Sequence, residues 1–149
     1  MQRSIWNVLI LLAAICLPFA PAAAQEADSL PRCDQAKADM GIQQEMNICA
    51  HREFLIADAT LNAQWKLTAA KMKAQDKDSA AWAADGRPGY FATLLEGQRA
   101  WITFRDAHCA SEGYFARGGS LEPLLVSTCK TALTEARTAQ LKELADYPD

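Results

Sequence analysis

The residues best suited to covalent chemistry in this sequence are four cysteines, Cys33, Cys49, Cys109 and Cys129. An even number of cysteines in an exported chain is typical of disulfide bonds, here two. Three pairings are possible. The sequential one, Cys33 with Cys49 and Cys109 with Cys129, suits a helical layout best because each pair then flanks a turn or a loop. The sequence has no Cys-x-x-Cys pair, so we expect structural disulfides and no redox-active dithiol.

The other candidates for catalysis or metal binding form no recognisable motif. His51 lies two residues from Cys49, and His108 is adjacent to Cys109, neither of which is a usual spacing of zinc ligands. The sequence contains no nucleophile motif, no glycine-rich phosphate loop and no cofactor fingerprint. We therefore expect a protein that is not an enzyme and that uses no metal and no cofactor.

A set of polar residues lies beside or within an apolar helical stripe. Asp58 and Asn62 are four residues apart and share a face, and Asn47 lies about three turns earlier. Arg99 and Arg105 can meet them from a second helix. A carboxylate that faces an apolar stripe must be paired or exposed, because isolated burial would raise its pKa or unfold the site. The expected role is a network between helices that fixes their register; a polar groove for a ligand is the alternative.

These residues are placed by segments with helical periodicity. Residues 43–72 carry apolar or small side chains in steps of three and four, without Gly or Pro. The pattern returns over residues 90–113 and 121–144, and a short helical turn is expected at residues 34–39. Between the first two helices we expect a mobile connection, in which Asp78 and Ser79 cap a short turn carrying Trp82 and residues 85–89 form a second turn. The sequence predicts an all-α fold, an antiparallel bundle of three main helices with two disulfides.

Residues 1–24 have the features of a signal peptide. Arg3 is followed by a short apolar run, and Ala22 and Ala24 fit cleavage before Gln25. Lipoprotein processing is disfavoured because a bulky Ile15 precedes Cys16. We expect a mature domain of residues 25–149 that is periplasmic or secreted.

The charge of the mature chain limits its partners. All 18 acidic residues and 14 of the 15 basic ones remain after cleavage, which gives a net charge of −4. This argues against nucleic-acid binding and against adsorption to anionic membranes. It is compatible with a cationic protein partner through faster encounter, and equally with ordinary solubility. The sequence does not predict an oligomeric state.

Short motifs run through the whole mature chain in a distinctive order. They are Cys33, Gln44–Ala50, Ala57-Asp58, Leu61-Asn62, Gln98–Trp101, Phe104–Asp106, Cys109, Gly119-Ser120, Cys129 and Thr134–Arg137. Together they resemble the N-terminal domain of LprI-type lysozyme inhibitors. The family usually has Thr at the position of Ile42, where it would form a capping box with Glu45, and tends to have Tyr at the position of Trp65. Neither difference affects the disulfide frame.

The resemblance implies an exported, helical, disulfide-bonded domain that inhibits lysozyme in the cell envelope. An inhibitor of this kind should place a tight loop or a polar residue into the sugar cleft. The candidate is the turn of Arg117, Gly118, Gly119 and Ser120, for which a plain helix connection is the alternative interpretation. Arg87, at the tip of a turn, is a second binding candidate. The alternative function is a structural or stress-related periplasmic protein with another partner or none.

Overall fold

The computed structural model describes residues 30–78 and 85–148, and every regular element of secondary structure within these ranges is a helix. Three long helices dominate: α3 (Gln43–Asp78), α4 (Tyr90–Gly113) and α5 (Glu122–Asp146). A short helix, α2 (Gln35–Asp39), precedes them, and a 3-10 turn, η2 (Tyr114–Ala116), follows α4. The expected signal peptide and the expected turn around Trp82 lie outside the described residues.

Helix α3 is longer than the apolar pattern predicts. The period fades after Met72, yet the helix continues for six more residues, to Asp78. These residues contain neither Gly nor Pro, and Lys, Ala and Gln support a helix without any apolar face. The prediction that the connection begins at residue 73 was therefore wrong, because a missing apolar stripe removes a packing partner but does not end a helix.

The extra turns of α3 have a role at the start of α4. Gly89, which precedes α4, has no side chain to cap the helix. The carboxylate of Asp76 instead accepts the backbone N–H groups of Tyr90 (2.6 Å) and Phe91 (3.1 Å). A Cβ atom on Gly89 would lie 2.6 Å from Oδ1 of Asp76, so a glycine permits this close approach. The end of one helix thus caps the beginning of the next.

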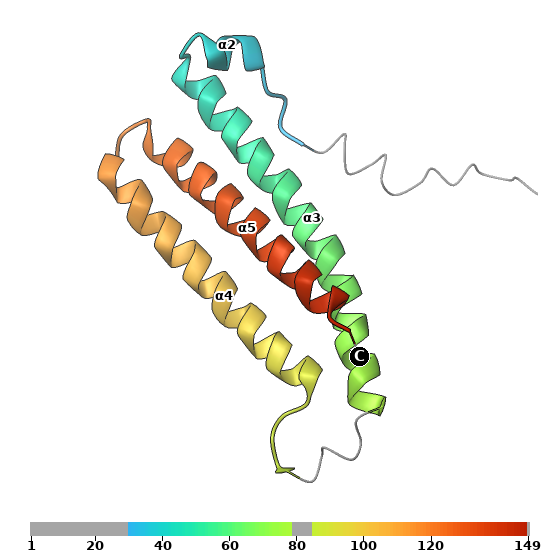
Figure 1. Ribbon diagram of the computed structural model, residues 1–149. Coiled ribbons are helices and arrows are strands. Elements are labelled where there is room, and N and C mark those ends of the chain that lie inside the picture. Colours follow the sequence, from blue (N-terminus) through green and yellow to red (C-terminus); the bar gives the residue numbers. More distant parts are fainter. Residues whose placement is uncertain (1–29, 79–84, 149) are drawn as a thin grey trace, which may run out of the picture.

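The three long helices form an up-down-up bundle, with α4 antiparallel to both of its neighbours in the chain (Figure 1). Helix α5 lies between α3 and α4 and packs against both, most extensively against α3. The all-α prediction with three antiparallel main helices is confirmed. Across residues 30–78 and 85–148, no helix combines the length and the apolar character that crossing a membrane requires.

The apolar core lies toward the end of the bundle where α3 finishes and α4 begins. Its buried members come from all three helices, and aromatic side chains pack around them. The core contains Leu61, Met72, Leu94 and Leu141, with Trp65, Phe91 and Trp101 against it. The buried hydroxyl of Thr68 donates to the carbonyl of Leu141 at 2.8 Å, which joins α3 to α5. We call this region the apolar end.

The opposite end of the bundle contains two disulfide bonds. Cys33 is bonded to Cys49, which ties the entry segment to α3, and Cys109 is bonded to Cys129, which ties the last turns of α4 to α5. The sequential pairing predicted from the helical layout is confirmed. We call this region, together with the connection between α4 and α5 at residues 114–121, the disulfide end.

Candidate functional site

A polar cluster joins the three helices between the two ends of the bundle. The guanidinium of Arg105, on α4, donates to Asp58 on α3 at 2.9 Å and to Thr134 on α5 at 3.3 Å. The side chain of Arg105 is 8% exposed, whereas that of Asp58 is 35% exposed. Asn62 donates to the second carboxylate oxygen of Asp58 at 3.1 Å. The guanidinium of Arg105 therefore connects all three long helices.

The buried part of this cluster is fully hydrogen-bonded. The rings of Phe54 and Trp101 each lie 5.2 Å from the guanidinium carbon of Arg105, a distance typical of cation–π contacts. Across the described residues, no buried side-chain nitrogen or oxygen lacks a hydrogen-bond partner. Because the buried polar atoms of the cluster already have partners within the protein, its geometry favours a role in fixing helix register.

An acidic neighbour extends the cluster toward solvent. Asp106 accepts from Arg105 at 3.0 Å and from Lys130 at 3.2 Å. Burial is the largest single influence on the pKa of Asp106 and raises it. The hydrogen bonds and charges of Arg105 and Lys130 together outweigh this, so the pKa lies below its usual range.

Two members of the expected network lie elsewhere. Asn47 donates to the backbone carbonyl of Ser120 at 2.9 Å, which joins the start of α3 to the α4–α5 connection. Arg99 is exposed on α4, whereas its neighbour Gln98 is buried and accepts from Arg137 on α5 at 2.9 Å. The structure thus brings Asp58, Asn62 and Arg105 together and places Asn47 and Arg99 apart from them.

The candidate turn at residues 117–120 is closed by its own hydrogen bonds. The backbone N–H of Arg117 donates to Tyr114, and that of Gly119 donates to Ala116 at 2.8 Å. Gly118 has a φ of 76°, a backbone conformation that residues other than glycine rarely adopt. Its N–H donates to the carboxylate of Glu122 at 2.7 Å. The turn therefore has a defined conformation, fixed at both of its ends.

The aromatic residues that precede this turn belong to no motif in the sequence. Phe115 in η2 is 91% exposed, the highest exposure of any large apolar side chain in the described residues. Tyr114 is half exposed, and its ring lies 4.6 Å from the guanidinium carbon of Arg117. The signal in the sequence was weak, because two aromatic residues directly after Gly113 fit no helical or strand period.

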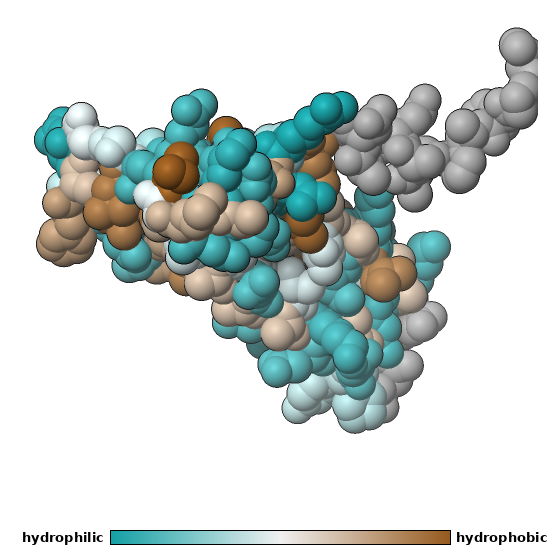
Figure 2. Space-filling view, turned by 90° about the horizontal axis from the view of Figure 1, so that it is seen from above, coloured by the Kyte–Doolittle hydropathy of each residue, from teal (hydrophilic) through white to brown (hydrophobic). Residues whose placement is uncertain are grey.

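Several large apolar side chains are exposed at the disulfide end. Figure 2 views the molecule from this side and shows apolar groups standing among hydrophilic ones. The exposed residues of the segment between α2 and α3 and of the α4–α5 connection are Met40, Ile42, Tyr114, Phe115 and Leu121. Exposed aromatic and aliphatic groups next to an arginine are a composition typical of protein interfaces.

The second binding candidate, Arg87, lies at the other end of the bundle. Its side chain forms a salt bridge with Asp85 at 2.6 Å, and its backbone N–H donates to the same carboxylate at 2.8 Å. The hydrogen bonds from Arg87 lower the pKa of Asp85. A guanidinium that is already paired within its own turn is less available to a partner than that of Arg117.

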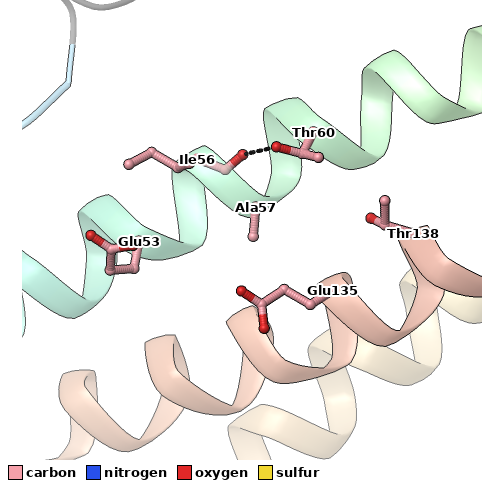
Figure 3. A pocket seen from close by; sticks show the side chains of 6 residues that line it. All are labelled: Glu53, Ile56, Ala57, Thr60, Glu135 and Thr138. Carbon is pink, nitrogen blue, oxygen red and sulfur yellow. Dashed lines mark hydrogen bonds between the residues drawn. The ribbon is translucent and has the colours of Figure 1, made fainter.

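A shallow hollow of about 210 Å³ lies between α3 and α5 (Figure 3). Glu53, Ile56, Ala57 and Thr60 face it from α3, and Glu135 and Thr138 face it from α5. Both carboxylates are exposed to solvent. The hollow is a concave surface that carries two carboxylates, whereas the connection between α4 and α5 carries the exposed Phe115.

The structure also brings potential metal ligands together at the disulfide end. Ligand atoms of His108, Glu112 and Cys129 lie within 4.8 Å of one another, although the sequence spacing gave no sign of this. The sulfur of Cys129 is bonded to Cys109, however, and a disulfide sulfur cannot ionise to the thiolate that metals bind. The oxidised protein therefore offers two ligands here and not a complete site.

The fold and these surfaces define a class: a small all-α domain with two disulfides whose exposed end presents a fixed turn. The chain matches the lysozyme inhibitor LprI family over residues 33–141, and it belongs to that family. An uncharacterised protein of Rhizobium meliloti (strain 1021) is 44% identical over 131 residues, which cover 85% of this chain and 86% of the relative. No solved structure matches the chain. The resemblance seen in the sequence is confirmed.

Proposed function

We propose that this protein is exported to the cell envelope and inhibits lysozyme by protein–protein binding, without enzymatic activity of its own. Membership of the LprI family supports this function. Two disulfides are typical of proteins in an oxidising compartment, which supports export. The acidic net charge supports rapid encounter with lysozymes, because lysozymes are typically cationic.

The observation that carries the proposal is the form of the disulfide end. Its connection is fixed by hydrogen bonds within the turn, and it exposes Phe115 to solvent. A preformed surface loses little conformational entropy on binding, so more of the contact energy appears as affinity. The polar cluster around Arg105, in contrast, is internally satisfied and serves the fold.

A lysis assay tests the function directly. Purified protein comprising residues 25–149, with both disulfides verified by mass spectrometry, is added to bacterial cell suspensions with c-type, g-type or phage-type lysozyme. We expect micromolar protein to slow the fall in turbidity with at least one class, and the reduced and alkylated protein to have no effect. No slowing with any class would remove the inhibitor function and favour a structural or stress-related envelope protein.

Export is tested separately. Expression of residues 1–149 in a Gram-negative host, followed by release of the periplasm, should yield a protein whose N-terminal residue is Gln25. Protein that is retained in the cytoplasm with free thiols would contradict the proposed location.

A further inference from the structure

We propose that Phe115 and Arg117 enter the catalytic cleft of lysozyme together and make inhibition competitive with the sugar substrate. This inference rests on the proposed function and assigns the contact that produces it. The two side chains stand two residues apart on one short segment that begins at η2 and ends in the closed turn.

Contacts with neighbouring helices restrain the backbone of this segment. The Cys109–Cys129 disulfide joins the two helices that flank the segment, and Asn47 of α3 donates to the carbonyl of Ser120 at 2.9 Å. Gly113 lies where α4 approaches α5, since a Cβ there would lie 2.5 Å from a methyl group of Val126. The segment that carries Phe115 is thus held to α3 at Ser120 and to α5 at Gly113, which limits the conformations it must lose on binding.

Phe115 supplies the apolar part of the contact. Its ring is almost fully exposed, so binding can bury nearly all of its surface, more than any other large apolar side chain of the described residues can contribute. The cleft offers a matching surface, because the general acid of lysozyme lies in an apolar pocket beside a tryptophan. An aromatic ring is the side chain that such a pocket can accept in place of a sugar.

Arg117 supplies the polar part. Its guanidinium lies over the Tyr114 ring, and it forms no salt bridge with a carboxylate of the described residues. Glycosidases carry two carboxyl groups about 5–10 Å apart on either side of the bond they cleave. A guanidinium has five N–H donors in a planar fork and forms strong hydrogen bonds with carboxylates. Charge complementarity therefore points Arg117 at the catalytic pair, whereas the acidic hollow between α3 and α5 would be repelled by it.

The test is inhibition kinetics with a soluble chito-oligosaccharide substrate and a lysozyme that the wild-type protein inhibits. We expect competitive inhibition, and binding measured by calorimetry should weaken when the N-acetylglucosamine trimer fills the cleft. Phe115→Ala and Arg117→Ala should each raise the inhibition constant by about tenfold or more, as truncation of an interface hot spot does. Arg117→Glu should raise it further, because it places a third carboxylate beside the catalytic pair.

Matched variants serve as controls. Phe104→Ala removes a half-exposed phenylalanine from α4, and Arg99→Ala removes an exposed arginine; both should stay within about twofold of wild type. Circular dichroism and thiol counts verify that every variant is folded and oxidised. The double variant Glu53→Gln with Glu135→Gln probes the acidic hollow and should also leave inhibition unchanged.

The outcomes separate the two proposals. If wild-type protein inhibits but does so non-competitively, or if Phe115→Ala and Arg117→Ala inhibit as well as wild type, the cleft assignment is wrong and the inhibitor function stands. If the Glu53→Gln, Glu135→Gln double variant loses inhibition while Phe115→Ala and Arg117→Ala retain it, the lysozyme contact lies at the hollow between α3 and α5. If wild-type protein inhibits no lysozyme, both proposals fail.

Discussion

The two ends of this bundle are held by different physical means. At the apolar end, large side chains from α3, α4 and α5 meet, and Leu141 has no exposed surface. At the disulfide end, the covered side chains are small or polar, Cys109 and Ser127 among them, while Phe115 and Tyr114 face solvent. A covalent bond constrains the chain without burying a large apolar surface. The disulfides therefore allow this end to keep its aromatic groups outside the core, where a partner can contact them.

The strongest test of this comparison removes the sulfur bonds. The disulfides close segments with sequence separations of 16 and 20, and each should stabilise the fold by about 3 kcal/mol in the chain-entropy model. Replacing all four cysteines by Ala should cost about 6 kcal/mol, a large share of the total stability of a domain. Urea unfolding followed by circular dichroism measures the loss. A loss below about 2 kcal/mol would show that packing alone holds the disulfide end.

The matching test at the apolar end creates a cavity. Leu141→Ala removes a fully buried side chain from the centre of the core and should lower the free energy of unfolding by about 2–5 kcal/mol. Leu144→Ala, on the same helix but partly exposed, is the control and should cost about 1 kcal/mol or less. Equal losses in the two variants would contradict the placement of the core.

Between the two ends, the stabilisation that the polar cluster provides should depend on the negative charge of Asp58. Asp58→Asn leaves the buried guanidinium of Arg105 with Asp106 as its remaining carboxylate partner. Because Asp58 is about one-third exposed, we expect a loss of about 2 kcal/mol, less than the 3–5 kcal/mol of a fully buried pair. A double-mutant cycle with Arg105→Met isolates the coupling energy. A coupling energy near zero would mean that the pair does not hold α3 to α4.

The local sequence pattern is sufficient to predict much of this fold. The bounds of α4 were predicted correctly because the turn before it ends at Gly89 and the helical period runs from there to Gly113. Of the three possible disulfide pairings, the order of the helices favoured the one that the structure has. The end of α3 was missed because its last turns carry no apolar stripe, and their stabilising contact, Asp76 with the start of α4, is between residues distant in sequence.

The polar cluster shows what a helical period can and cannot provide. Gln98 and Arg105 are seven residues apart and share the buried face of α4, whereas Arg99 is displaced by about 100° from Gln98, so the period itself would have separated them. The position of Asn47 along the bundle, opposite Ser120, depends on how the helices slide against each other. Thr134, the partner on α5, depends on that same axial register, which no single helix encodes.

The smallest expected effect is a pH dependence at the solvent edge of the cluster. The pKa of Asp106 is lower in the folded protein than in the unfolded chain. In the window between these two pKa values the unfolded state binds more protons, so stability rises with pH. The contribution of Asp106 to the free energy of unfolding is therefore complete above the pKa of the unfolded chain, about 3.9. It is lost as the pH falls through the pKa of Asp106 in the folded protein. Asp106→Asn should flatten the dependence of the urea midpoint on pH between about pH 5 and 2.

Two further measurements separate this effect from other carboxylates. Asp34, which caps α2, and Asp85 also have lowered pKa values, through hydrogen bonds from Lys37 and Arg87 respectively, so Asp34→Asn serves as a control at a carboxylate without a buried partner. Added salt should weaken the contribution of all three, because exposed charges are screened. Asp106 should retain the most, since of these three carboxylates only Asp106 contacts the buried guanidinium of Arg105, 8% exposed, which salt reaches least. A pH profile of Asp106→Asn that coincides with wild type would limit the cluster to Asp58, Asn62, Arg105 and Thr134, with all of its charge pairing between α3 and α4.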